Sequence, residues 1–318
     1  MRARLTRHGW GALAVGAALG VTGPRLGYPA VTAFGAGLAG LVLAALLQLG
    51  RLPSLGVRRE VTPGAPRRFE ECTVTLAVVN RGHRAARLEG VELMNGEELE
   101  VSVPYLSAGK AVHVRYPVPT DRRGPLVLGP LRLRRLGLGG LAVGTANLRG
   151  RQTVVVAPRV LPTSVPGGLT VIIDNREAAY PRNSSDFDEA VDVASSLCGA
   201  ATAEPVELRA ASGPIDADAL ATLPLLRGRV RPLATVDPQR RLAVCVTGAA
   251  GEPAPLLAAL TGVPRAVLLV VDTRPERMVS MVGTALVLRA PRAEELLVAW
   301  HEAAAGFGVD SLSGVEVR

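Results

Sequence analysis

The chain has 318 residues and a mass of 33.1 kDa, a length sufficient for about two domains. Its content of 48% apolar residues and its mean hydropathy of +0.27 exclude a disordered or fibrous protein. Three widely spaced cysteines exclude a disulfide framework, and 3% aromatic residues leave little for stacking bases, so we expect no nucleic-acid partner. The net charge of +8 is uneven: residues 1–50 carry +4, residues 51–159 carry +9 and residues 160–318 carry −5.

The first 50 residues predict a transmembrane hairpin with helices at about 9–23 and 28–49. The 25 uncharged residues 26–50 would form a helix of roughly 37 Å, enough to cross a hydrocarbon core of about 30 Å. The uncharged stretch 9–24 is short for a span, and its alternative interpretation is the core of a signal peptide. Arginines before and after the two helices predict a multi-pass protein of the inner (plasma) membrane, with both termini in the cytoplasm.

Residues 51–160 predict an antiparallel β-sandwich, because apolar and polar residues alternate between turns rich in Gly, Pro and Asn. Strands are expected at 73–79, 88–94, 98–103, 111–117, 126–128, 131–134 and 152–157. Arg132, Arg134 and Arg135 form either a patch that binds nucleic acid or lipid, or one solvated face of a sheet.

Residues 161–168 predict a linker, residues 169–306 a doubly wound α/β domain, and residues 307–318 a tail. Apolar runs predict buried parallel strands at 169–174, 206–210, 242–247, 266–272 and 285–288, and helices are expected at 190–197, 215–223, 255–260 and 292–305. Ligands of such sheets bind outside the carboxyl ends of the strands. We therefore expect a sheet-edge interaction site at Asp174, Arg176, Thr247 and Asp272. Asp174 and Arg176 form either a strand-end ion pair that orders the loop or a clamp for a substrate.

An acidic first helical turn follows the first of these strands. Its carboxylates interact favourably with the helix dipole, and as an alternative they form a docking face for a basic partner. The candidate docking face comprises Asp186, Asp188, Glu189 and Asp192. The four histidines lie away from the predicted sheet edge, and the chain has no phosphate-binding loop. We therefore predict no catalytic residue.

The order of two membrane helices, a sandwich and an α/β domain resembles the bacterial membrane family called domain of unknown function 58. The residues that carry this resemblance are Leu-Thr-Val-Ile-Ile-Asp at 169–174, Phe-Asp-Glu-Ala-Val at 187–191 and the Arg-Arg-Gly-Pro-Leu segment at 122–126. The resemblance implies a C-terminal domain similar to a von Willebrand factor A domain. It implies no established activity, and it implies a membrane-associated partner such as a MoxR-type AAA+ ATPase or a transglutaminase-like membrane protein.

The chain departs from this family at two places. Residues 159–168 lack the Arg-x-Tyr-x-x-Gly-Asp segment that usually precedes the α/β domain. The Asp-x-Ser-x-Ser metal motif of von Willebrand A domains is replaced by Asp174-Asn175-Arg176-Glu177-Ala178, where a guanidinium group would repel a cation. A degenerate domain without metal or cofactor is therefore expected.

Three functions remain open at this point. We predict a membrane-anchored, non-catalytic scaffold that binds a protein, and hence not an enzyme. The alternative is a metal- or anion-dependent protein that binds or hydrolyses a ligand through Asp174 and Asp272. A third interpretation is a non-functional remnant that has lost the central segment.

Overall fold

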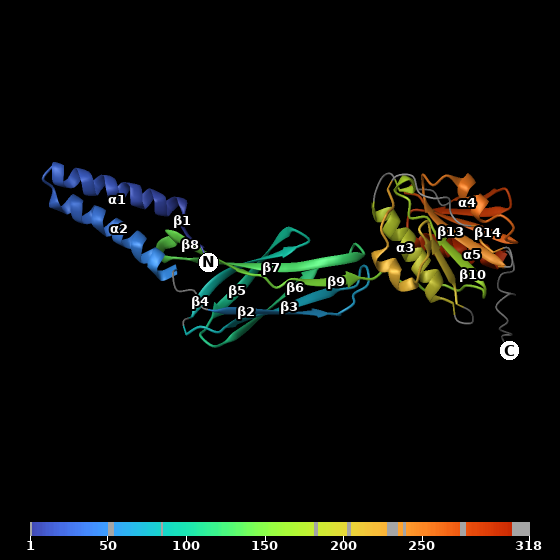
Figure 1. The fold of residues 1–318 in the computed structure, drawn as a ribbon, viewed down its shortest axis with the longest axis horizontal. Helices are drawn as coiled ribbons and strands as arrows, with labels where there is room; N and C mark the ends of the chain where they lie inside the picture. Colours follow the sequence, from blue (N-terminus) through green and yellow to red (C-terminus); the bar gives the residue numbers. More distant parts are fainter. Residues whose placement is uncertain are drawn as a thin grey trace. The chain divides into compact units, whose positions relative to one another are not determined.

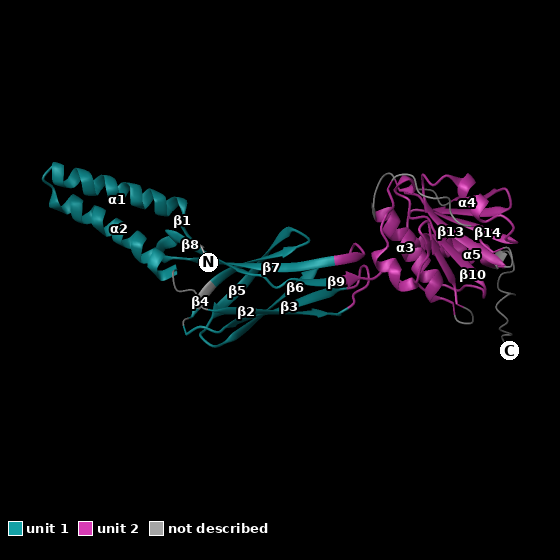
Figure 2. Ribbon diagram, in the orientation of Figure 1, with its two compact units in different colours: residues 1–64, 71–118, 126–154 teal, residues 65–70, 119–125, 155–318 magenta. Residues whose placement is uncertain are grey.

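The structure, a computed structural model, contains two compact units, and each is built from stretches that are separate in sequence (Figure 2). Unit 1 comprises Met1–Gly64, Glu71–Val118 and Leu126–Val154, and unit 2 comprises Ala65–Glu70, Pro119–Pro125 and Val155–Arg318. The predicted tail at 307–318 lies outside the described residues. The structure describes residues 2–49, 54–83, 85–180, 184–201, 205–227, 235–237, 240–273 and 278–306.

Unit 1 begins with a short strand and two helices, β1 (Arg2–Leu5), α1 (Arg7–Arg25) and α2 (Pro29–Leu49). The helices approach closely at glycines, since a Cβ built on Gly35 would lie 2.7 Å from the carbonyl oxygen of Gly16. The first helix, predicted at about 9–23, continues through Pro24 to Arg25. The helix tolerates this proline, because a proline in the last helical turn removes only one hydrogen bond. The connection to α2 then bends at Gly27, whose φ is +73°.

Among the described helices, α2 alone has the length and hydropathy of a membrane span. A single apolar helix near the N-terminus supports membrane association, and a signal sequence has the same properties. The two-span hairpin therefore stays a prediction.

The strand β1 was not predicted. It pairs antiparallel with β8 (Ala142–Leu148), with Leu5 opposite Ala142. Thr6 then caps α1: its hydroxyl accepts a hydrogen bond from the Gly9 amide at 3.1 Å and donates to the Gly140 carbonyl at 2.7 Å. The first helix is thus attached at its N-terminus to a strand of unit 1.

The rest of unit 1 consists of antiparallel sheets, as predicted (Figure 1). One sheet has the order β1-β8-β7-β4-β5, with β9 also paired to β7, and the other has the order β2-β3-β6. Their strands are β2 (Leu55–Thr62), β3 (Cys72–Asn80), β4 (Ala86–Met94), β5 (Glu97–Leu106), β6 (Ala111–Val118), β7 (Gly124–Leu136), β8 and β9 (Gln152–Val156). The strand β3 alternates buried and half-buried side chains along its whole length, which gives it one face toward a core.

A buried ion pair joins the two sheets. Arg59 on β2 donates to Glu92 on β4 at 2.8 and 3.2 Å, and Arg59 also donates to the Gly150 carbonyl at 2.8 Å. Both side chains are almost fully buried. Burial raises the pKa of Glu92, while Arg59 opposes this shift. Because either ion alone would be buried without a partner, the pair depends on both residues.

We predict that Glu92→Ala lowers the free energy of unfolding by about 3–5 kcal/mol, because it leaves a buried guanidinium group without its carboxylate. The matched control is Glu98→Ala, which breaks an exposed pair with Arg132 on the same sheet. That change should cost less than about 1 kcal/mol. Denaturant unfolding of the full chain in detergent measures both values, and equal losses in the two variants would contradict the prediction.

Unit 2 contains a seven-stranded sheet of order β12-β11-β10-β13-β14-β16-β15. The five inner strands are parallel, and β12 and β15, which were not predicted, add antiparallel at the edges. If the five parallel strands are numbered in chain order, their order across the sheet is 2-1-3-4-5, which is a doubly wound arrangement. The direction in which successive strands are added to the sheet reverses between β10 and β13. The strands are β10 (Leu169–Ile173), β11 (Glu207–Ala210), β12 (Gly213–Pro214), β13 (Leu242–Gly248), β14 (Arg265–Val271), β15 (Met278–Val282) and β16 (Ala285–Ala290).

Helices cover both faces of this sheet (Figure 1). α3 (Ser184–Gly199) and α5 (Ala293–Gly306) pack on one face through an apolar cluster that includes Leu197 and Trp300, and α4 (Pro253–Ala259) packs on the other through Leu256. Strands buried on both faces explain the continuous apolar runs of the sequence. The helix expected at 215–223 is a shorter 3₁₀ helix over Ala217–Thr222. The fold is mixed α/β, and a von Willebrand A-like domain stays a prediction.

Candidate functional site at the carboxyl edge of the α/β sheet

The predicted sheet-edge site falls at the switch point of the sheet. Asp174 follows β10 and Thr247 lies near the end of β13, the two strands between which the winding direction changes. The Asp174 amide donates to the Val246 carbonyl at 2.8 Å. The backbone of Asp174 therefore continues the hydrogen-bonded pairing between β10 and β13. Its carboxylate is fully buried. This is the place where doubly wound proteins bind ligands.

Three of the four predicted residues meet here. The Arg176 guanidinium donates to both oxygens of Asp174, from Nε at 2.7 Å and from Nη2 at 2.8 Å. The Thr247 hydroxyl donates to Asp174 Oδ2 at 2.9 Å, and the Arg176 amide donates to Oδ1 at 3.2 Å. Both carboxylate oxygens therefore have protein donors, and the hydrogen bond that Arg176 donates to Asp174 raises the pKa of Arg176. The arrangement is an ordered strand-end ion pair.

Asp272, the fourth residue, directly follows β14, which lies on the far side of β13. Its carboxylate lies 3.6 Å from Nη1 of Arg289 on the neighbouring β16. The sheet order thus places one strand between the strands that carry Asp174 and Asp272. Each acid is accompanied by its own arginine.

Two neighbours of this site were missed. Asn175 is fully buried, accepts from the Ala211 amide at 3.0 Å and donates to the Pro224 carbonyl at 3.0 Å, so it ties the loop after β10 to the following segment. Tyr180 is buried against Phe187, and its hydroxyl has no hydrogen-bond partner among the described residues. Burial and the nearby Asp174 raise the pKa of Tyr180. The one feature of the sequence that could have predicted the role of Asn175 is its position directly after the acid that ends the strand.

The described part of the chain contains no group of three His, Cys, Asp or Glu side chains that could hold a metal ion. At the switch point the reason is local, because Arg176 and Thr247 already occupy both Asp174 oxygens. Displacing Arg176 would be needed before a cation could coordinate this carboxylate.

The acidic first turns of α3 lie inside unit 2 rather than on its surface. Asp186, Asp188 and Asp192 are buried. Arg68 donates to Asp192 at 2.7 Å and to Glu189 at 2.8 Å, and it comes from the loop between β2 and β3. Within the predicted docking face, Glu189 and Asp192 are thus paired with an arginine of the same unit.

Arg123 and Arg159 complete this cluster. Arg123, from the loop between β6 and β7, lies 3.0 Å from Asp188, stacks over the Phe187 ring and donates to the Leu220 and Leu223 carbonyls. The Arg159 amide donates to Asp192 Oδ1 at 2.8 Å. The sequence contains no indication of these pairs, because loop arginines 33 to 124 positions away look like ordinary surface residues.

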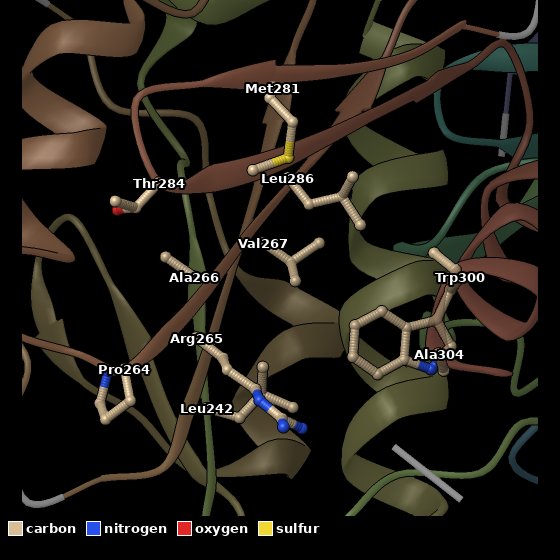
Figure 3. A pocket seen from close by; sticks show the side chains of 11 residues that line it. Leu242, Pro264, Arg265, Ala266, Val267, Met281, Thr284, Leu286, Trp300 and Ala304 are labelled. Carbon is tan, nitrogen blue, oxygen red and sulfur yellow. The ribbon is translucent and has the colours of Figure 1, made fainter. Parts of the chain in front are cut away.

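A separate small cavity opens at the opposite, amino edge of the sheet (Figure 3). It has a volume of about 230 Å³ and lies between the starts of β13, β14 and β16 and the end of α5. Leu286, Val267 and Trp300 line it, with Arg265 at its margin. The Trp300 ring nitrogen is already bonded to the Ser164 carbonyl at 3.1 Å. The cavity is smaller than the roughly 300–1,000 Å³ typical of ligand pockets.

No family model and no curated protein matches this chain. Solved structures that align with it include the alkylpurine DNA glycosylase AlkC of Pseudomonas fluorescens, at 15% identity over 41% of this chain and 39% of that one, with a TM-score of 0.26. A CARDB domain from Pyrococcus furiosus aligns at 13% identity over 31% of this chain and 89% of that one, with a TM-score of 0.23. The ApaA protein of Bordetella pertussis aligns at 13% identity over 32% of this chain and 92% of that one, with a TM-score of 0.25. Alignments at these TM-scores carry no conclusion about fold or function.

The Asp192 cluster predicts a pH dependence of stability. Burial raises the pKa of Asp192 from 3.8 to about 6, although Arg68 opposes this shift. A carboxyl group whose pKa is raised by folding stabilises the fold below its unfolded pKa, and this contribution is lost as the pH rises through the folded value. The unfolding free energy of the wild type should therefore fall relative to that of Asp192→Asn between about pH 4 and pH 6.

Denaturant unfolding of the full chain across this pH range measures the difference. Asp218→Asn, at an exposed position of the same unit, is the matched control and should change with pH as the wild type does. A wild type that gains stability over Asp192→Asn as the pH rises would contradict the predicted direction.

Proposed function

We propose that this protein is a membrane-anchored, non-catalytic scaffold whose α/β unit binds another protein in the cytoplasm. The observation that carries the proposal is the edge strand β15, which exposes apolar side chains and no charge. The closed ion pair at the switch point supports a non-catalytic role, because Asp174 is fully engaged by protein donors.

Membrane anchoring rests on α2 and on the charges around the helices. The outer surface of α2 exposes large apolar side chains, among them Phe34, Leu43 and Leu47. A helix of 21 residues spans about 31 Å, close to the thickness of a hydrocarbon core. We propose that α1 and α2 form a two-span hairpin with both termini in the cytoplasm, because arginines precede α1 and follow α2.

The strand β15 is suited to bind an extended segment of a partner. Its sequence, Met-Val-Ser-Met-Val, has no charged residue. It lies at the end of the sheet order, and Met278, Val279 and Met281 are exposed. Soluble proteins usually protect such edges with charges or proline, and partners use unprotected edges by adding a strand. The occupant we propose is an apolar extended segment of a partner protein, for which the family resemblance suggests a MoxR-type AAA+ ATPase.

The proposal predicts that Val279→Glu abolishes partner binding. Val279 is 63% exposed, so a carboxylate there leaves the fold intact but is costly to desolvate against the apolar side chains of an added neighbouring strand. The matched control, Val298→Glu, changes a similarly exposed valine on α5 and should retain the partner. Affinity purification from solubilised membranes, with mass spectrometry to identify an AAA+ ATPase, measures the result. Equal recovery with both variants would exclude β15 as the binding strand.

Topology is tested with a tag after Arg318. We expect the tag to be protected from protease in intact spheroplasts and degraded after lysis, and the chain to stay in the membrane pellet after alkaline extraction. Degradation in intact spheroplasts would place the α/β unit outside, and release by alkali would contradict a spanning hairpin.

The alternative is a metal- or anion-dependent ligand-binding or hydrolytic protein that uses Asp174 and Asp272. Calorimetry with Mg²⁺ separates the two functions. We expect no saturable binding, because a cation would have to displace Arg176 from Asp174. Saturable binding that is lost in Asp174→Ala would favour the alternative.

A further inference from the structure

The turn between β7 and β8 exposes leucines on the unit that carries the apolar helices. Residues 136–141 read Leu-Gly-Leu-Gly-Gly-Leu. Leu136 is 53% and Leu138 is 48% exposed. Gly139 and Gly140 have φ values of +60° and +68°, a left-handed conformation that glycine adopts without strain. About half of each of these leucine side chains is therefore in contact with water unless a partner covers it.

Direct packing places this turn against the last turns of α2. A Cβ built on Gly137 would lie 2.9 Å from the Ala45 carbonyl oxygen, so only glycine allows this approach. Ala45, Leu49 and Ala142 form a buried cluster, which Leu141 covers from the β7–β8 turn. The turn therefore packs directly on the last turns of α2.

The residues around the turn match a bilayer interface. Trp10, in the first turns of α1, is 62% exposed, and Tyr28, at the other end of the helix pair, is 61% exposed. Aromatic side chains of this kind gather at the two surfaces of a membrane. Arg4 and Arg7 are exposed beside Trp10 and can contact anionic headgroups.

We propose that Leu136 and Leu138, together with Trp10, form an interfacial patch that inserts into the cytoplasmic headgroup region of an anionic bilayer. The patch rests on the proposed hairpin anchor, since it needs α2 to span the membrane. Ala45 lies four residues before the end of α2, or about 6 Å along the helix axis, which puts the turn at the boundary of the hydrocarbon core. The occupant of the exposed turn is therefore lipid.

The test uses the full chain in vesicles of phosphatidylcholine mixed with phosphatidylglycerol. An environment-sensitive NBD group is attached to Leu138→Cys or, as a second variant, Leu136→Cys, and lipids that carry a nitroxide quench it. Leu47→Cys reports on α2 itself. Glu97→Cys is the control. Glu97, on β5, lies level with a point on β7 that is eight residues before Leu136, or about 27 Å along the strand. The chain without an added cysteine gives the background from Cys198, a half-buried thiol whose pKa burial raises to about 11.

We expect the labels at 138 and 136 to show blue-shifted emission and nitroxide quenching that approach those at 47, while the label at 97 resembles one in water. Unquenched labels at both 136 and 138 beside a quenched label at 47 would overturn the patch and leave the anchor standing. Unquenched labels at all three positions would overturn the anchor itself.

Discussion

Pairing of buried carboxylates with arginines is the constraint on which the α/β unit depends. A carboxylate removed from water loses several kcal/mol of solvation, which a neighbouring guanidinium group partly offsets. Unit 2 meets this need at the switch point, along α3 and at the end of β14. The pairs are Asp174 with Arg176, Asp188 with Arg123, Asp192 with Arg68 and Asp272 with Arg289. Removing one member of a pair would leave the other without its partner, so each pair acts as a single structural element.

This constraint directs where binding can occur. The switch point of a doubly wound sheet is the usual ligand site, but here it is filled by a side chain from its own loop. The acidic turns of α3 are likewise occupied, by Arg68 and Arg123 from loops that join antiparallel strands of unit 1. The two surfaces for which we propose partners are instead apolar and uncharged: the edge strand β15 in unit 2 and the turn beside α2 in unit 1. Protein and lipid partners suit such surfaces better than small charged ligands do.

The sequence located most elements because their patterns are local. Strands such as β10 and β13 are buried on both faces, and their continuous apolar runs show this directly. The pairs of α3 could not be found in this way. Arg68 and Asp192 are separated by 124 positions, and an acidic first helical turn looks the same whether water or arginine faces it. The strand β1 was not predicted, because four residues before a helix are too few to show an alternation of apolar and polar residues. Asp174, Arg176 and Thr247 could be assigned to one edge, because parallel strands end together.

The attachment of the helices to the sheet has a consequence for the proposed anchor. Thr6 and β1 tie the start of α1 to β8, while Gly137 and the cluster around Leu49 tie the end of α2 to the same region. A helix pair held at one terminus could swivel about its linker. Here both ends are fixed to neighbouring strands, so a rotation of the helices must break sheet hydrogen bonds or open the apolar cluster. If α2 spans the bilayer, the same contacts hold the β7–β8 turn at the membrane surface, and the exposed leucines of that turn then remove apolar surface from water only by entering the lipid.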